Sequence, residues 1–448
     1  MKFCLRVRTV VLFALMSSIG LWLSGGEAGA TRANQQPVGS SGRTAGNVFN
    51  SLPEADADLP WAIFFDYRRP AWAFAPKALA LPMASITVTT TADTIDAAAN
   101  CVAVTLASLP GPGGQTSLRE AICAANSNPG PDTITFSVNG TFALTGAAND
   151  DNGNSGDFDI KQSLTINGNG AANTILDGSG IERIFDVFPS APSTFDLFGL
   201  TLRNGDTRTT SFLEGGAIYL HNNVTSTFNS IQVINNFSGA NGAIENRGTL
   251  TINNSVISNN QTLPASGNVV GGGLHNAGTL TIDTTTISNN TVRGEGGGIA
   301  TTSGAAVVVN ITNSTISGNT ASITGGTLGN GGGISTTGNQ GTINLTNCTI
   351  SGNRADGNGG GAAFVSVSGG AVTLTNVTIT NNTADNDNNN LGAGGGFSQG
   401  GTTTVTLRNT IVAGNFNSTA ATRDDISGAV VNTSSYNLIG DGTRMSGL

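Results

Sequence analysis

The sequence predicts an all-β protein, a right-handed parallel β-helix solenoid of about eight to ten coils with roughly 30 residues each. A capping module with a short helix is expected before the first coil. Three observations predict this fold: two sequence units alternate along most of the chain, they recur with a regular period, and only 10% of the residues are charged. The 63 glycines among 448 residues follow no three-residue period, which excludes collagen.

The repeat has two parts. The first is a glycine, usually in a pair or triplet, that precedes an apolar residue; copies begin at Gly215, Gly242, Gly271, Gly296, Gly331, Gly359 and Gly394. The second alternates threonine with aliphatic residues and ends in Asn-x-x-Ile-x-x-Asn or a close variant. Its central aliphatic residues lie 30 residues apart on average, at Leu202, Val233, Ile257, Ile287, Ile316, Ile350, Ile379 and Val412. A constant motif at variable intervals is typical of a solenoid whose loops absorb the differences in length.

The alternation within the second unit predicts strands. In residues 249–252 and 279–282, threonine alternates with leucine or isoleucine, so one side chain type faces inward and the other outward. From Ile257 onward, an asparagine lies three residues after each central aliphatic residue and should stack from coil to coil. Side-chain amides can bond to each other in such a stack, and asparagine tolerates left-handed turns. This predicted structural ladder comprises Asn260, Asn290, Asn319, Asn353, Asn382 and Asn415.

The chain divides into four parts. Residues 1–30 read as a secretory signal peptide, because a basic start precedes the apolar residues 10–23 and then Ala28 and Ala30. An N-terminal membrane anchor is the alternative. Residues 31–85 form a Pro/Ala/Gly-rich linker, 86–145 the capping module and 146–443 the β-helix repeats. We expect a secreted, extracellular or cell-surface protein with no transmembrane span in the mature chain.

The cysteines fit an oxidising compartment. Cys101 and Cys123 lie close together within one module, so we expect a disulfide between them. Cys348 stands in place of a small residue of a repeat and should be buried and unpaired.

The region from Ile86 to Phe136 contains Ser-Leu-Arg-Glu-Ala-Ile at 117–122, Ala-Ala-Asn at 124–126 and Gly-Pro-Asp-Thr-Ile at 130–134. It resembles the CSLREA module of secreted and surface β-helix proteins, with Thr116 in place of the family's cysteine. The glycine repeats resemble those of polymorphic outer membrane proteins, and the resemblance as a whole implies a pectin-lyase-like fold. Read physically, residues 117–122 form an amphipathic helix capped by Ser117, in which Arg119 and Glu120 are structural.

The predicted strand register places one group of chemically reactive side chains close together. Tyr219, Glu245 and His275 each follow the strand aliphatic residue in three consecutive coils, which places their backbones about 4.8 Å apart on one outward face. His221 and Arg247 lie two residues further along. A Glu beside a His can orient it as a base, so these are candidate catalytic residues. The alternative is ordinary variation at exposed positions, where later coils have Ala300 and Ser335.

A second candidate site is an acidic stretch. Asp150, Asp151, Asp157 and Asp159 stand among asparagines and glycines, and such oxygen-rich turns suit Ca²⁺. A solvated acidic loop is the alternative reading. No other cofactor is expected.

The net charge of −9 argues against nucleic-acid binding. The signal-peptide pattern, the repeats, the few charges and the lack of a recognisable catalytic set predict a non-enzymatic secreted or cell-surface β-helix. Its expected role is adhesion, scaffolding or contact with a polysaccharide or cell-surface ligand. The alternatives are a pectin-lyase-like polysaccharide lyase or hydrolase, and an autotransporter-like passenger without its barrel.

Overall fold

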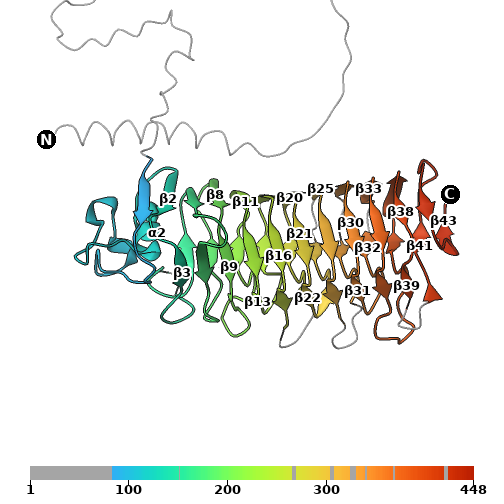
Figure 1. The fold of residues 1–448 in the computed structure, drawn as a ribbon, viewed down its shortest axis with the longest axis horizontal. Coiled ribbons are helices and arrows are strands. Elements are labelled where there is room, and N and C mark those ends of the chain that lie inside the picture. Colours follow the sequence, from blue (N-terminus) through green and yellow to red (C-terminus); the bar gives the residue numbers. More distant parts are fainter. Residues whose placement is uncertain are drawn as a thin grey trace, which may run out of the picture. The chain divides into compact units, whose positions relative to one another are not determined.

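The structure is a computed structural model that describes residues 83–447 except 151, 265–268, 303–306, 323–328, 339–340, 367–368 and 418–421. The predicted signal peptide, nearly all of the predicted linker and Asp151 lie outside the described residues. Within them the chain forms a parallel β-helix whose coils follow one another in sequence order (Figure 1). The predicted fold class is confirmed.

Three sheets of 11 strands each run the length of the described β-helix. Sheet A contains β1 (Ser85–Val88), β2 (Asp132–Phe136), β5 (Leu164–Asn167), β8 (Ser193–Phe198), β11 (Val224–Asn229), β15 (Thr249–Asn253), β20 (Thr279–Asp283), β25 (Val308–Thr312), β29 (Thr342–Thr346), β33 (Ala371–Thr375) and β37 (Thr404–Arg408). Sheet B contains β3 (Gly140–Ala143), β6 (Thr174–Asp177), β9 (Thr201–Arg203), β12 (Gln232–Ile234), β16 (Val256–Ser258), β21 (Thr286–Ser288), β26 (Thr315–Ser317), β30 (Thr349–Ser351), β34 (Thr378–Thr380), β38 (Ile411–Val412) and β42 (Leu438–Ile439).

The third sheet positions the candidate site. Sheet C contains β4 (Phe158–Ile160), β7 (Phe185–Val187), β10 (Ile218–Leu220), β14 (Ile244–Asn246), β19 (Leu274–Asn276), β24 (Ile299–Thr302), β28 (Ile334–Thr337), β32 (Ala362–Ser366), β36 (Phe397–Gly401), β41 (Ile426–Ala429) and β43 (Arg444–Ser446).

Two smaller sheets complete the described strands. Sheet D contains β13 (Phe237–Ser238), β17 (Gln261–Thr262), β22 (Thr291–Val292), β27 (Thr320–Ala321), β31 (Arg354–Ala355), β35 (Thr383–Ala384), β39 (Phe416–Asn417) and β40 (Thr422–Arg423). A pair is formed by β18 (Val269–Val270) and β23 (Gly294–Glu295). The β39–β40 pair is antiparallel, in contrast to the other pairings in sheet D.

The central aliphatic residues of the repeat stack as predicted. From Leu202 to Val412, each pairs with its counterpart in the next strand of sheet B. In sheet A, the leucines and isoleucines of β15 and β20 are buried, while their threonines are exposed or half-buried. Burial of one face in every coil fixes the register, because a slip of one residue would turn the apolar set outward.

The asparagine ladder is also confirmed. Nδ2 of Asn260 donates to Oδ1 of Asn290 at 2.9 Å, and the same bond repeats along the ladder to Asn415. The ladder extends beyond the prediction at both ends, to Asn236 before it and Asp425 after it. The expectation that the ladder asparagines adopt the left-handed conformation is wrong. The residue before the ladder asparagine has the positive φ, as at Asn259 (58°) and Asn289 (56°). The ladder asparagines contribute their buried amides instead.

Glycines allow successive coils to approach closely at the turns. A Cβ atom on Gly297 would lie 2.3 Å from the carbonyl oxygen of Gly332 in the next coil, so any larger residue would separate the two coils. This is why the first unit of the repeat requires glycine.

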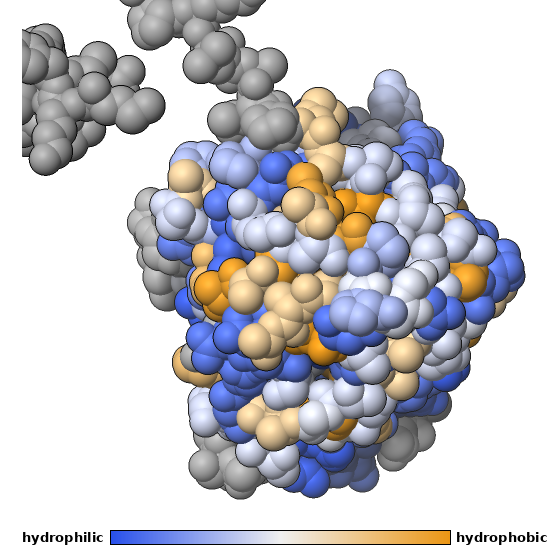
Figure 2. All heavy atoms as spheres, turned by 90° about the vertical axis from the view of Figure 1, so that its left-hand side faces the viewer, coloured by the Kyte–Doolittle hydropathy of each residue, from blue (hydrophilic) through white to orange (hydrophobic). Residues whose placement is uncertain are grey.

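The capping module covers the first coils. Helix α2 (Leu118–Ser127) begins at Ser117, whose side chain accepts the N–H of Glu120 while the Glu120 carboxylate accepts the N–H of Ser117. Arg119 is buried and forms an ion pair of 2.6 Å with Asp93, which supports its structural role. Two short 3₁₀ helices, η3 (Cys101–Ala103) and η4 (Leu106–Ser108), complete the module. Seen from this end, apolar and hydrophilic side chains are interspersed on the surface (Figure 2).

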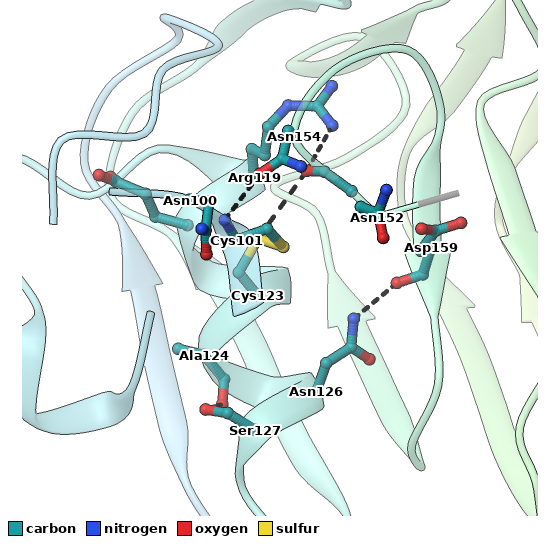
Figure 3. The surroundings of a disulfide bond; sticks show 12 residues. Asn100, Cys101, Arg119, Cys123, Ala124, Asn126, Ser127, Asn152, Asn154 and Asp159 are labelled. Carbon is teal, nitrogen blue, oxygen red and sulfur yellow. Dashed lines mark hydrogen bonds between the residues drawn. A yellow bond between two sulfur atoms is a disulfide. The ribbon is translucent and has the colours of Figure 1, made fainter. Parts of the chain in front are cut away.

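The predicted disulfide is present. Cys101 of η3 is bonded to Cys123 of α2, beside the loop that contains Asn152 and Asn154 (Figure 3). Cys348 is free and buried, as expected. A disulfide indicates an oxidising environment. No helix in the described part of the chain has the length and apolar character needed to cross a membrane.

Candidate functional site

The predicted register of Tyr219, Glu245 and His275 is confirmed. The three residues pair directly across β10, β14 and β19 of sheet C. The same register position is occupied by Asp186 in β7 and Asp159 in β4. The polar row is therefore longer than the sequence suggested, and it continues into the later coils as Ala300 and Ser335.

A second row lies two residues further along each strand. It consists of Lys161, Phe188, His221 and Arg247, which follow β4, β7, β10 and β14. The backbone N–H of His221 donates to the carbonyl of Val187, and that of Arg247 to the carbonyl of Leu220, so the β-helix spacing persists here. The two rows together bring acidic, basic and aromatic side chains onto one face.

Glu245 and His275 are buried, which corrects the expectation of exposed positions. The Glu245 side chain is 0% exposed and that of His275 is 6% exposed. Glu245 accepts from Nε of Arg247 at 2.9 Å and lies 2.5 Å from Nδ1 of His275, whose Nε2 lies 2.5 Å from Oγ1 of Thr302. Both side chains are therefore buried, and they are already hydrogen-bonded to each other and to Arg247 and Thr302 of the neighbouring row.

Aromatic and cationic side chains pack around the ring of Tyr219. Its ring stacks on that of His221 with 4.1 Å between centroids, and the Arg247 and Arg183 guanidinium carbons lie 4.9 and 5.6 Å from its centroid. Burial raises the pKa of Tyr219 to about 12, although the Arg247 charge acts in the opposite direction. The phenol therefore stays protonated near neutral pH and can donate a hydrogen bond, but it does not act as a base.

His221 is the accessible histidine of this face. Its side chain is 39% exposed, and its Nε2 lies 3.1 Å from Oδ1 of Asp186.

An open pocket of about 270 Å³ lies above these residues. Phe188, Pro189, Tyr219, His221, Asn222, Asn223 and Arg247 line it. The rings of Phe188 and His221 are 6.0 Å apart, and Asn222 and Asn223 are exposed. The pocket thus combines aromatic surface with hydrogen-bond donors and acceptors.

Buried charges support the floor of this site. Arg183 is fully buried and lies between Asp157 and Asp186, at 3.6 and 3.7 Å. Burial, and then the charge of Glu182, raises the pKa of Asp157 well above its usual value, while Arg183 acts against the increase.

The structure does not assemble the acidic stretch into a cation site. The Asp150 carboxylate accepts backbone N–H groups of Asn152, Asn154 and Ser155 and so closes a turn. Asp157 faces Arg183, and Asp159 lies 3.4 Å from Nζ of Lys161. Among the described residues, which do not include Asp151, no group of three His, Cys, Asp or Glu side chains is placed to hold a metal ion.

Neither a protein-family model nor a curated protein matches the chain. Among solved structures, the chain is similar to the crystal structure of the pectate lyase Pel9A, with a TM-score of 0.43 and 15% identity over 80% of this chain and 82% of that one. The assignment as a parallel β-helix rests on the strand pairing described above and not on this likeness.

Sequence reasoning missed Asp186 and Phe188. The coil that contains them lacks the glycine pair that marks later repeats, and Phe185 stands where most later strands have an aliphatic residue. Extending the period backward from Ile218 by one strand would have found both.

Proposed function

We propose that this protein is a secreted or cell-surface β-helix that binds carbohydrate without transforming it, through the pocket above Tyr219. One observation carries the proposal: partly exposed rings of Phe188 and His221 lie beside Arg247 and two exposed asparagines in one open pocket. A sugar ring has an apolar C–H face, which packs on an aromatic side chain. Its hydroxyl groups form hydrogen bonds with the few polar side chains that converge on the same pocket.

The binding role is favoured over catalysis by the state of the titratable groups. Glu245 and His275 already bond to each other and to Arg247 and Thr302, and Tyr219 remains protonated. A catalytic base or acid must reach the proton that it transfers, and these groups are covered.

The cellular location belongs to the same proposal. The signal-peptide pattern of residues 1–30 and the disulfide Cys101–Cys123 support export to an oxidising compartment. The resemblance of residues 86–136 to the CSLREA module supports display outside the cell.

Binding of the purified full-length chain to a panel of neutral and acidic polysaccharides tests this function. Arg247→Ala and His221→Ala should each weaken binding about tenfold, as expected for loss of a central contact. Thr337→Ala is the matched control, because Thr337 lies at the same register in a later coil, and it should bind as wild type does. Release of shortened or unsaturated products from any polysaccharide would contradict the non-enzymatic role.

One observation favours a polysaccharide-cleaving enzyme as the second candidate. His221 is exposed and held by Asp186, as a general base requires. In that case products would form, and both His221→Ala and Asp186→Asn would abolish their formation while His275→Gln would not.

A further inference from the structure

A second open pocket adjoins the first. It measures about 190 Å³ and is lined by Cys101, Val102, Cys123, Asn126, Ser127, Asn152 and Lys161. Figure 3 shows most of these side chains around the disulfide. Residues 101–127 supply most of the pocket lining, and Asn152 and Lys161 complete it from the segment that follows.

Lys161 and Phe188 connect the two pockets. Lys161 lines the pocket beside the disulfide, and its Nζ lies 5.2 Å from the centroid of the Phe188 ring, which lines the pocket above Tyr219. The surface from Val102 to Arg247 is thus continuous. Lys161 and Arg247 follow strands three coil steps apart, which corresponds to about 14 Å along the β-helix axis. Such a surface is longer than one sugar ring.

The charges along this surface are locally balanced. Lys161 pairs with Asp159, His221 with Asp186, and Arg247 with Glu245. Glu214 adds a further carboxylate 3.8 Å from Arg247. Because Lys161 and Arg247 each have an acidic neighbour, the surface offers no excess positive charge for an acidic polymer.

We propose that the ligand is a linear, neutral polysaccharide that lies parallel to the β-helix axis, with one part over Tyr219 and the other against the disulfide-bonded capping module. This inference rests on the proposed carbohydrate-binding function and deepens it. The Val102 side chain, 75% exposed at the rim of the pocket, is the apolar contact that the module offers.

Titration of the full-length chain with neutral oligosaccharides of increasing length tests the inference. Affinity should rise with length until the chain reaches the capping module and then become constant. Val102→Asp should weaken binding of long oligosaccharides about tenfold and leave that of short ones unchanged. Leu391→Asp is the matched control, since Leu391 is a similarly exposed apolar side chain (62%) that lines neither pocket, and it should match wild type at every length.

The outcomes separate the two proposals. Absence of binding to every carbohydrate overturns both. Binding that is independent of length, or equal for Val102→Asp and Leu391→Asp, overturns the extended orientation and leaves the proposed function standing. Stronger binding of acidic polymers that falls steeply with salt overturns the neutral ligand.

Discussion

The two halves of sheet C share one backbone but carry different side chains. In the first five strands, the outward register position holds Asp159, Asp186, Tyr219, Glu245 and His275. In the next five it holds Ala300, Ser335, Ala363, Ser398 and Ser427, and in the last strand, β43, it holds Arg444. The strand pairing is the same throughout, so the scaffold does not require charge at this position. Under the proposed function, the ligand binds over the charged strands and not over the small-residue strands.

The largest effect should come from the asparagine ladder, which both halves share. Replacement of Asn260 or Asn353 by Ala removes buried amide bonds to the neighbouring asparagines and to a backbone carbonyl. Each variant should lose about 3–4 kcal/mol of unfolding free energy, since several buried partners are left unsatisfied.

Chemical denaturation measures both ladder variants, with Thr342→Ala on the exposed face of sheet A as the control. Equal losses would show that the scaffold is uniform. A loss of unfolding free energy in only one of the two variants would contradict the claim that the ladder stabilises both halves alike.

The disulfide should come next. Without the Cys101–Cys123 bridge, the module that caps the charged half should lose about 3 kcal/mol, because the bridge closes a loop of 22 residues. Thermal unfolding of the double variant Cys101→Ser/Cys123→Ser, with Cys348→Ser as the control, checks this effect. A melting temperature equal to that of wild type would refute it.

The side chain at the outward register position of sheet C should contribute substantially to stability in the charged half only. Glu245→Ala leaves Arg247 and His275 without their shared carboxylate and should cost about 2–3 kcal/mol. Ser335→Ala, at the same position in the later half, should cost about 0.5 kcal/mol. The unfolding free energies of the two variants should be measured under identical conditions. Similar losses of unfolding free energy would contradict the distinction between the two halves.

The smallest effect is the pH dependence that one buried carboxyl of the charged half, Asp157, contributes. The pKa of Asp157 is raised by burial and by Glu182, so the folded protein favours the protonated carboxyl. The stability that this group contributes is fully present below its unfolded pKa and is lost as pH rises through the raised folded pKa.

Asp157→Asn should therefore reduce the decline in melting temperature as pH rises above about 4, the ordinary pKa of an aspartate. Asp283→Asn is the control, because hydrogen bonds from Thr312 and others lower the pKa of Asp283 and its contribution is lost as pH falls. An unchanged slope for Asp157→Asn would contradict the assignment.

The fold could be predicted because its determinants repeat. Each copy of the glycine and asparagine units adds the same backbone contact or amide bond, so their period reveals the register. The ladder was predicted from Asn260 to Asn415, but its terminal acceptor Asp425 was not, because a different residue type performs the same bonding there.

The site could be predicted only in part, because it depends on what differs between coils. The sequence placed Tyr219, Glu245 and His275 in one row, but it could not show that Arg247 and Thr302 occupy the bonding atoms of Glu245 and His275. Burial of a side chain by its neighbours in adjacent coils depends on three-dimensional packing. The repeat pattern of the sequence therefore does not reveal it.

Hydrogen exchange of the backbone with and without bound polysaccharide tests the central claim most directly, because it compares the two halves within one molecule. Slower exchange should appear in the segments that carry Phe188, His221 and Arg247, and exchange around Thr337 and Val365 at the equivalent register should stay unchanged. Protection of the later half alone, or equal protection of both, would contradict the assignment of ligand binding to the charged half of sheet C.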